Sequence, residues 1–308
     1  MLSRIAGAVR FKEPLSFHTS LRIGGPAEFF VVARDMEDVR YAVAFAHQEG
    51  LPVVVLGGGN NLLVADQGLQ AMVLKLGGVF GRVEFHGDEV AAGAGVGLSE
   101  LIRQAAAKDL GGLEGLAGVP ATVGGALAAN VGTREGAIGE LCTAVYFVLP
   151  DGTLAECRPQ SPTGSRALDL PPGAIVAGCR MQLTRRPAAV IQKDIQQRLR
   201  RRRASQPFAL ACAGYIWKNP PGQIAERLID AAGLRGKRIN DAEVSSKCSN
   251  LIVNRSGASA GDVLALMDLT RERVEAKFGV TLVPDLTLLG LPSAPAAPRA
   301  PLEMAGVH

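Results

Sequence analysis

A run of three glycines and two asparagines, Gly57–Asn61, directly follows the short apolar segment Pro52–Leu56. The apolar segment is too short for a helix and rich in valine, which predicts a buried β-strand. Glycines after a strand let several backbone N–H groups converge on one anion without steric penalty. The pattern therefore indicates a phosphate-binding loop or, as the simpler alternative, a tight turn between two strands. It is not a P-loop, because no Gly-Lys-Ser/Thr follows.

A second glycine-rich stretch, Gly118–Gly125, is followed closely by Asn130 and Gly132. Glycine and alanine crowd this region and its hydrophobic periodicity is weak, as expected where the backbone approaches a ligand closely. Two such loops, starting at positions 57 and 118, would suit an extended dinucleotide held along its length. The alternative is a pair of surface loops with no ligand.

The rest of the chain alternates between helical and extended patterns. Helices are expected at residues 35–50, 98–108, 188–203, 223–232 and 260–277. Strands are expected at residues 62–64, 71–76, 89–97, 145–149, 153–154, 174–183 and 251–253. The residues from Leu291 onward are rich in proline and alanine, which predicts a disordered tail over 291–308.

Charge and cysteine content exclude few functions, but they favour a cytoplasmic protein. The net charge of +4 is mild, the five cysteines show no metal or redox spacing, and no apolar run reaches membrane-span length. Charged residues near Met1 argue against a signal peptide. The arginine-rich run Arg198–Arg203 is most simply a solvated helix end, and it could also steer anionic ligands. It lacks the interleaved aromatics of a nucleic-acid surface.

Several motifs follow one another in order over nearly the whole chain, from about residue 13 to residue 290. The segments are Phe17–Ala27, Val55–Val64, Gly118–Gly125, Gln206-Pro207, Ala213–Pro220, Leu228–Gly236, Val244–Lys247, Asn250–Asn254 and Phe278–Val280. Together they resemble the motifs of the UDP-N-acetylenolpyruvoylglucosamine reductase family.

The resemblance implies an α+β fold: an FAD-binding region of the vanillyl-alcohol-oxidase type, in two subdomains over residues 1–187, and an α+β substrate-binding domain over residues 188–290. It implies FAD as cofactor and NADPH as co-substrate. The implied reaction reduces UDP-N-acetylglucosamine enolpyruvate to UDP-N-acetylmuramate, in peptidoglycan precursor synthesis. A monomer with no membrane or nucleic-acid partner is expected.

Matching motifs assign roles to particular residues. Arg166 is expected to stabilise charge on the substrate, while Lys218 and Asn219 are expected to contact it. The residues expected to bind FAD are Gly57, Gly58, Gly59, Asn60, Asn61, Gly118, Val119, Pro120, Thr122, Gly124, Gly125 and Asn130.

The chain departs from the family pattern where the chemistry is done. Tyr215 stands at the position of the proton-donating serine, Asp285 at that of the catalytic glutamate, and Cys248 at that of a histidine. Aspartate keeps the charge with a shorter reach, and a phenol is a better proton donor than an aliphatic hydroxyl. Tyr215 and Asp285 are therefore expected to be catalytic. The alternative is a non-catalytic or re-purposed paralogue that binds FAD and a UDP-sugar.

Overall fold

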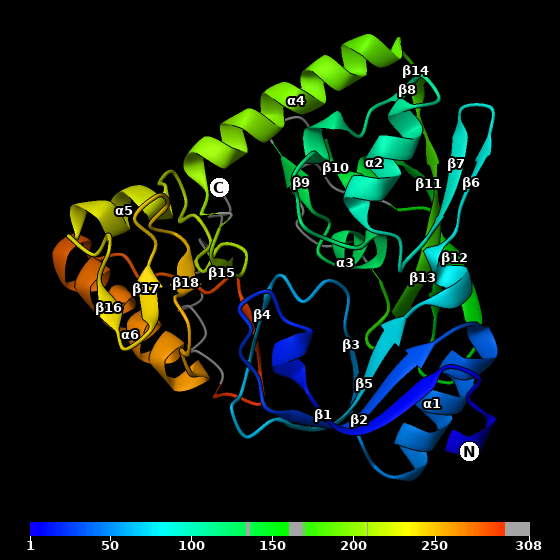
Figure 1. Cartoon of the computed structure of the whole chain (residues 1–308), viewed down its shortest axis with the longest axis horizontal. Coiled ribbons are helices and arrows are strands. Elements are labelled where there is room, and N and C mark those ends of the chain that lie inside the picture. Colours follow the sequence, from blue (N-terminus) through cyan, green and yellow to red (C-terminus); the bar gives the residue numbers. More distant parts are fainter. Residues whose placement is uncertain (134–135, 160–167, 169, 208, 293–308) are drawn as a thin grey trace, which may run out of the picture.

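The computed structural model describes residues 1–133, 136–159, 168, 170–207 and 209–292, which fold into three parts, each built on a β-sheet (Figure 1). Arg166 and the expected tail from residue 293 onward lie outside the described residues. Leu291, at the start of that expected tail, packs against the core of the C-terminal part.

The first sheet has the strand order β1-β2-β5-β3. Its strands are β1 (Ala8–Pro14), β2 (Pro26–Ala33), β5 (Leu69–Leu76) and β3 (Val53–Val55). Strand β1 is antiparallel to β2, whereas β2 and β3 both run parallel to β5. Helix α1 (Met36–Gln48) packs on this sheet through Val39, Val43 and Ala46, the apolar face expected from the sequence. Its start is fixed locally, because the Asp35 carboxylate accepts the backbone N–H of Asp38.

Strand β3 is the edge strand of this sheet, and the expectation that it is buried was wrong. Val53 and Val54 are half-buried, and Val55 is 42% exposed. A continuous apolar run indicates burial on both faces only in a central strand, and β3 has a single neighbour, β5.

The second sheet is antiparallel, in the order β12-β11-β13-β7-β6. Its strands are β6 (Val83–His86), β7 (Glu89–Gly93), β11 (Cys142–Val148), β12 (Leu154–Cys157) and β13 (Ile175–Gln182). The hairpin expected around residues 149–153 joins β11 to β12. Helices α2 (Leu98–Ala106) and α3 (Val123–Ala128) contribute to the core under this sheet. The sequence did not predict α3, because Gly124 and Gly125 disfavour a helix and six residues show no clear period.

The C-terminal part contains a third sheet, in the order β15-β18-β17-β16. Its elements are α4 (Ala188–Ser205), β15 (Ala211–Cys212), α5 (Ala225–Ala231), β16 (Arg238–Ile239), β17 (Ala242–Val244), β18 (Ile252–Asn254) and α6 (Ala260–Phe278). Helix α4 runs along the top of Figure 1 from the second sheet to this third part. Helix α6 begins in a capping box at Ser259 and Asp262 and ends at Gly279, with φ +65°.

Short pairs complete the described fold. Strand β4 (Leu62–Val64) is paired in parallel with β19 (Thr287–Leu289), so segments far apart in the sequence share a ladder. The remaining pairs are β8 (Leu110–Gly111) with β14 (Thr184–Arg185), and β9 (Gly132–Thr133) with β10 (Gly136–Ala137). Within the described ranges, no helix has the length and apolar character to cross a membrane.

Candidate active site

The loop Gly57–Asn61 joins β3 to β4 and is fixed by the segment before β2. The carbonyl of Gly59 accepts the backbone N–H of Ser20 at 3.0 Å and its hydroxyl at 3.2 Å. Gly59 has φ +64°, and a Cβ there would lie 2.0 Å from the carbonyl oxygen of His18. This position therefore requires glycine on both conformational and steric grounds.

The second loop, Gly118–Gly125, lies directly against the first. A Cβ on Gly57 would lie 2.7 Å from Thr122 Oγ1 and 3.8 Å from the Cα of Gly125. Thr122 caps α3, and its hydroxyl accepts the backbone N–H of Gly125 at 3.2 Å. The two glycine-rich loops thus meet through the backbone of Gly57 and Gly125 and the small side chain of Thr122. Such a surface suits an anionic cofactor held by backbone N–H groups.

Asn130, also expected to bind the cofactor, is buried and adopts a left-handed conformation with φ +39°. Its side-chain oxygen accepts the backbone N–H of Gly139 at 3.1 Å. This bond gives Asn130 a role in shaping the chain after the second loop.

A third segment, Ala213–Pro220, reaches the first loop from the C-terminal part. The N–H of Gly214 donates to the carbonyl of Asn60 at 2.5 Å, and a Cβ on Gly214 would lie 3.1 Å from Asn61 Oδ1. The side chain of Asn61 donates to the carbonyl of Asp285 at 3.0 Å, and its own carbonyl accepts the N–H of Thr287. Asn60 and Asn61 therefore tie the first loop to both catalytic candidates' segments.

Tyr215 and Asp285 lie on paired segments. The N–H of Asp285 donates to the carbonyl of Ile216 at 2.8 Å, and that of Lys218 to the carbonyl of Val283 at 2.8 Å. The amide of Asn250 clamps this region from behind, accepting from the N–H of Trp217 and donating to its carbonyl, both at 2.9 Å. Both catalytic candidates are thus held beside the first glycine loop by backbone and amide contacts.

The Tyr215 side chain is half exposed, at 48%. Partial burial raises the pKa of its phenol, Cys248 and Glu226 raise it further, and Gln206 and the Arg202 guanidinium oppose the rise. The phenol is therefore fully protonated near neutral pH, as a proton donor requires.

Cys248 lies behind Tyr215 and is only 3% exposed. Burial first, and then the neighbouring Glu226 carboxylate, raise the pKa of its thiol to about 12. The thiol therefore stays protonated and is a poor nucleophile. Unlike the histidine of the family pattern, it adds no charge near neutral pH.

The two substrate candidates have different surroundings. Asn219 Oδ1 accepts the backbone N–H of Ala225 at 3.0 Å, which positions the start of α5. Lys218 is exposed, and its backbone is fixed by the bond to Val283. Arg166, the expected charge-stabilising residue, lies in the segment 160–167 that the structure does not describe.

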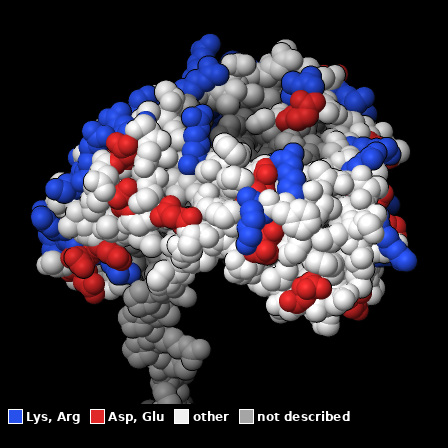
Figure 2. Space-filling model, turned by 60° about the horizontal axis from the view of Figure 1, so that its bottom comes forward, with Lys and Arg blue, Asp and Glu red and all other residues white. Residues whose placement is uncertain are grey.

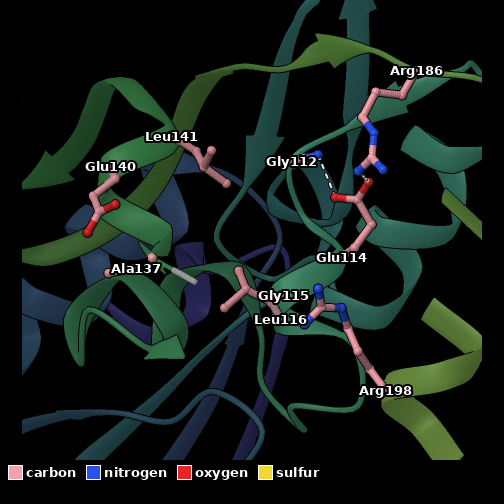
Figure 3. A pocket seen from close by; sticks show the side chains of 10 residues that line it. Gly112, Glu114, Gly115, Leu116, Ala137, Glu140, Leu141, Arg186 and Arg198 are labelled. Atoms are coloured by element: carbon pink, nitrogen blue, oxygen red, sulfur yellow. Dashed lines mark hydrogen bonds and ion pairs between the residues drawn. The ribbon is translucent and has the colours of Figure 1, made fainter. Parts of the chain in front are cut away.

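A cavity of about 170 Å³ lies beside the start of the second loop (Figure 3). On one side Glu114, which is buried, accepts the N–H of Gly112 at 2.6 Å and a guanidinium N–H of Arg186 at 2.7 Å. Arg186 also pairs with Asp194 of α4 at 2.9 Å. These bonds fix the position of α4 relative to the second loop.

Sequence reasoning missed three residues that shape the site. Ser20 holds the first loop and Asn250 clamps the Tyr215 segment. Arg202 of α4 contacts the second loop, since a Cβ on Gly118 would lie 2.9 Å from its Cδ. Ser20 and Asn250 stand in motif segments, which was the available signal. Nothing in the sequence distinguishes Arg202 from the other arginines of the run Arg198–Arg203.

The fold and the matching family models identify an FAD-binding oxidoreductase with an added C-terminal domain. Residues 27–158 match the family model of an FAD-binding domain. Residues 206–289 match that of the UDP-N-acetylenolpyruvoylglucosamine reductase C-terminal domain. The chain belongs to the UDP-N-acetylenolpyruvoylglucosamine reductase family.

Individual relatives agree with this assignment over almost their full lengths. The chain is 41% identical over 289 residues to UDP-N-acetylenolpyruvoylglucosamine reductase 2 of Symbiobacterium thermophilum, covering 93% of this chain and 94% of that one. It is 38% identical over 288 residues to the reductase of Geobacter metallireducens, covering 94% and 96%. The crystal structure of the Thermus caldophilus reductase superposes with a TM-score of 0.80 at 36% identity, covering 92% and 99%.

Proposed function

We propose that this chain reduces UDP-N-acetylglucosamine enolpyruvate to UDP-N-acetylmuramate with NADPH, and that Tyr215 and Asp285 carry the proton chemistry. The family assignment supports the FAD-dependent reaction. The observation that supports the residue roles is that Gly214, next to Tyr215, and Asp285 bind Asn60 and Asn61 of the first glycine loop.

The residues present fit FAD. Gly57–Asn61 and Gly118–Gly125 lie against each other with only the small Thr122 side chain at the contact of Gly57, and their backbone N–H groups would hold the cofactor's diphosphate. Asn130 supports the chain that follows the second loop. When bound, FAD supplies hydride transfer from NADPH to the double bond of the substrate.

The chain's own residues then manage the proton and the charge. Tyr215 Oη donates a proton to the carbon that bears the carboxylate, because its raised pKa keeps it protonated. Asp285 assists this proton transfer from the neighbouring segment, which is fixed by a backbone bond to Ile216 and by the side chain of Asn61. Lys218, Asn219 and Arg166 contact the diphosphate and carboxylate of the substrate.

We further propose that the chain acts as a cytoplasmic monomer without a nucleic-acid partner. The small anionic substrates of the family reaction support this setting, and the mild net charge of +4 suits it. Size-exclusion chromatography with light scattering tests the oligomeric state. A dimer would contradict the proposed monomer and leave the rest of the proposal unchanged.

The test separates the two half-reactions. Under anaerobic conditions NADPH should bleach the visible flavin absorbance, and addition of the enolpyruvyl substrate should restore it with formation of UDP-N-acetylmuramate. A flavin that the substrate perturbs but never reoxidises would instead favour a ligand-binding paralogue, for which the Tyr215 substitution is the motivating observation.

A further inference from the structure

Arg202 occupies a different position from its neighbours in the arginine-rich end of α4. Arg200, Arg201 and Arg203 are exposed, whereas Arg202 is half-buried. Its side chain lies against the second glycine loop, with Cδ at 2.9 Å and Nε at 3.7 Å from where a Cβ of Gly118 would stand. A residue with a side chain at position 118 would displace it.

The same helix end also reaches the Tyr215 segment. The N–H of Gln206 donates to the carbonyl of Arg202 at 2.8 Å, and Gln206 is one of the groups that lower the pKa of the Tyr215 phenol. Lys247 Nζ reaches the carbonyl of Arg203 at 3.5 Å from the segment that carries Cys248. Arg202 therefore stands between a flavin loop and the expected proton donor.

The positive charge of the Arg202 guanidinium has no acidic partner within the described residues. Across the described ranges, no carboxylate forms an ion pair with Arg202. The one titratable group that affects the pKa of its guanidinium is the phenol of Tyr215. Burial lowers the pKa of the guanidinium, though an arginine remains charged throughout the physiological range. A half-buried cation without an acidic partner in a ligand site favours an anion in the bound state.

The position of Arg202 beside Tyr215 indicates which anion it binds. Hydride addition to one carbon of the enolpyruvyl double bond leaves an electron pair on the other, which carries the carboxylate. Tyr215 gives its proton to that second carbon and becomes a phenolate, which regains a proton from solvent. A cation beside Tyr215 is therefore beside the carboxylate, where negative charge accumulates.

We propose that Arg202 binds the carboxylate of the enolpyruvyl group and stabilises the charge that develops on it. This role rests on the proposed function, and it adds a second cation to the one expected at Arg166. Figure 2 shows the surface hollowed in its upper middle, with Lys and Arg side chains on either side and acidic side chains beside those on the right.

Binding of paired ligands tests the role without turnover. UDP-N-acetylmuramate carries the carboxylate and UDP-N-acetylglucosamine lacks it, and flavin absorbance changes report the binding of each. The FAD-loaded wild type should prefer the carboxylate ligand by at least about tenfold. Arg202→Ala should remove this preference while keeping the affinity for UDP-N-acetylglucosamine, and Arg202→Lys should restore part of it.

Arg200→Ala is the matched control, because it removes an exposed arginine about 200° around the same helix. It should behave as the wild type. In single turnovers, Arg202→Ala should slow substrate reduction by reduced flavin about a hundredfold while flavin reduction by NADPH is unchanged.

An unchanged carboxylate preference in Arg202→Ala would overturn the inference, as would an equal loss of affinity for both ligands, which would assign Arg202 to the diphosphate or to folding. A wild type that binds neither ligand would instead overturn the proposed function, and the inference with it.

Discussion

At the residue scale, Tyr215 is expected to donate the proton that a serine donates in the family pattern. Tyr215→Phe keeps the ring and removes only the hydroxyl, so the fold and flavin content should be preserved. We expect substrate reduction to fall by about 10²–10⁴-fold, the usual contribution of a general acid. Stopped-flow absorbance measures both half-reactions, and NADPH should still reduce the flavin at the wild-type rate. Full turnover in the variant would remove Tyr215 as donor.

The raised pKa of Tyr215 predicts an alkaline limit to the reaction. A donor works below its pKa, so the rate of substrate reduction should hold through neutral pH and fall only as pH rises through the raised phenol pKa, above about 10. Arg202 and Gln206 lower this pKa, whereas Cys248 and Glu226 raise it. In Arg202→Lys the alkaline limb should stay close to that of the wild type because the charge is kept. A rate that falls near pH 7 would contradict this assignment.

At the element scale, locally encoded elements were predictable from the sequence. Helices α1 and α6 carry their own start and stop signals at Asp35, Ser259 and Gly279, so their sequence and structural limits agree. Helix α3 has a local cap at Thr122, but its two glycines and its six-residue length leave no hydrophobic period to detect. The partial exposure of β3, in contrast, depends on which strands flank it. Such facts are tertiary and cannot be obtained from local periodicity.

The site also combines features that the local sequence encodes with features that only the tertiary structure provides. Its glycine loops could be predicted as loops, because glycine has a local conformational meaning. The bond from Asn61 to Asp285 spans 224 residues, and no local spacing encodes it. The family resemblance supplied Tyr215 and Asp285, while the contact of Arg202 with Gly118 emerged only from the packing of α4.

Two glycines with nearly the same backbone test why the first loop needs glycine. Gly59 has φ +64° and Gly50 has φ +65°, but a Cβ at Gly50 meets nothing within 4 Å. Gly50→Ala should therefore cost only the left-handed strain, about 1 kcal/mol. Gly59→Ala adds a clash with the His18 carbonyl, so it should lower Tm further and reduce the FAD content of the purified protein. Equal effects of the two changes would refute the steric requirement.

At the scale of the whole molecule, the proposed FAD-binding region and C-terminal domain share a core. Leu21, Ile23 and Leu63, from the N-terminal part of the sequence, are buried among residues of the C-terminal part. The side chain of Asn254 in β18 donates to the carbonyl of Leu21 at 2.9 Å, and β19 pairs with β4. A division of the chain at residue 187 therefore separates segments that pack together.

This sharing predicts that residues 188–290 do not fold alone. Without Leu21, Ile23 and Leu63 the fragment would leave their apolar neighbours in water, and β19 would lose β4, its ladder partner. In the full chain, Leu63→Ala should lower the free energy of unfolding by about 2–5 kcal/mol, as large-to-small core changes do. Thermal unfolding of that variant should remain a single transition at lower temperature, because both parts lose the same contact. Amide NMR spectra of the fragment provide the decisive measurement: collapsed dispersion is expected. A dispersed, native-like spectrum would show that the C-terminal domain is independent of the loop that binds the segments of the proposed catalytic residues.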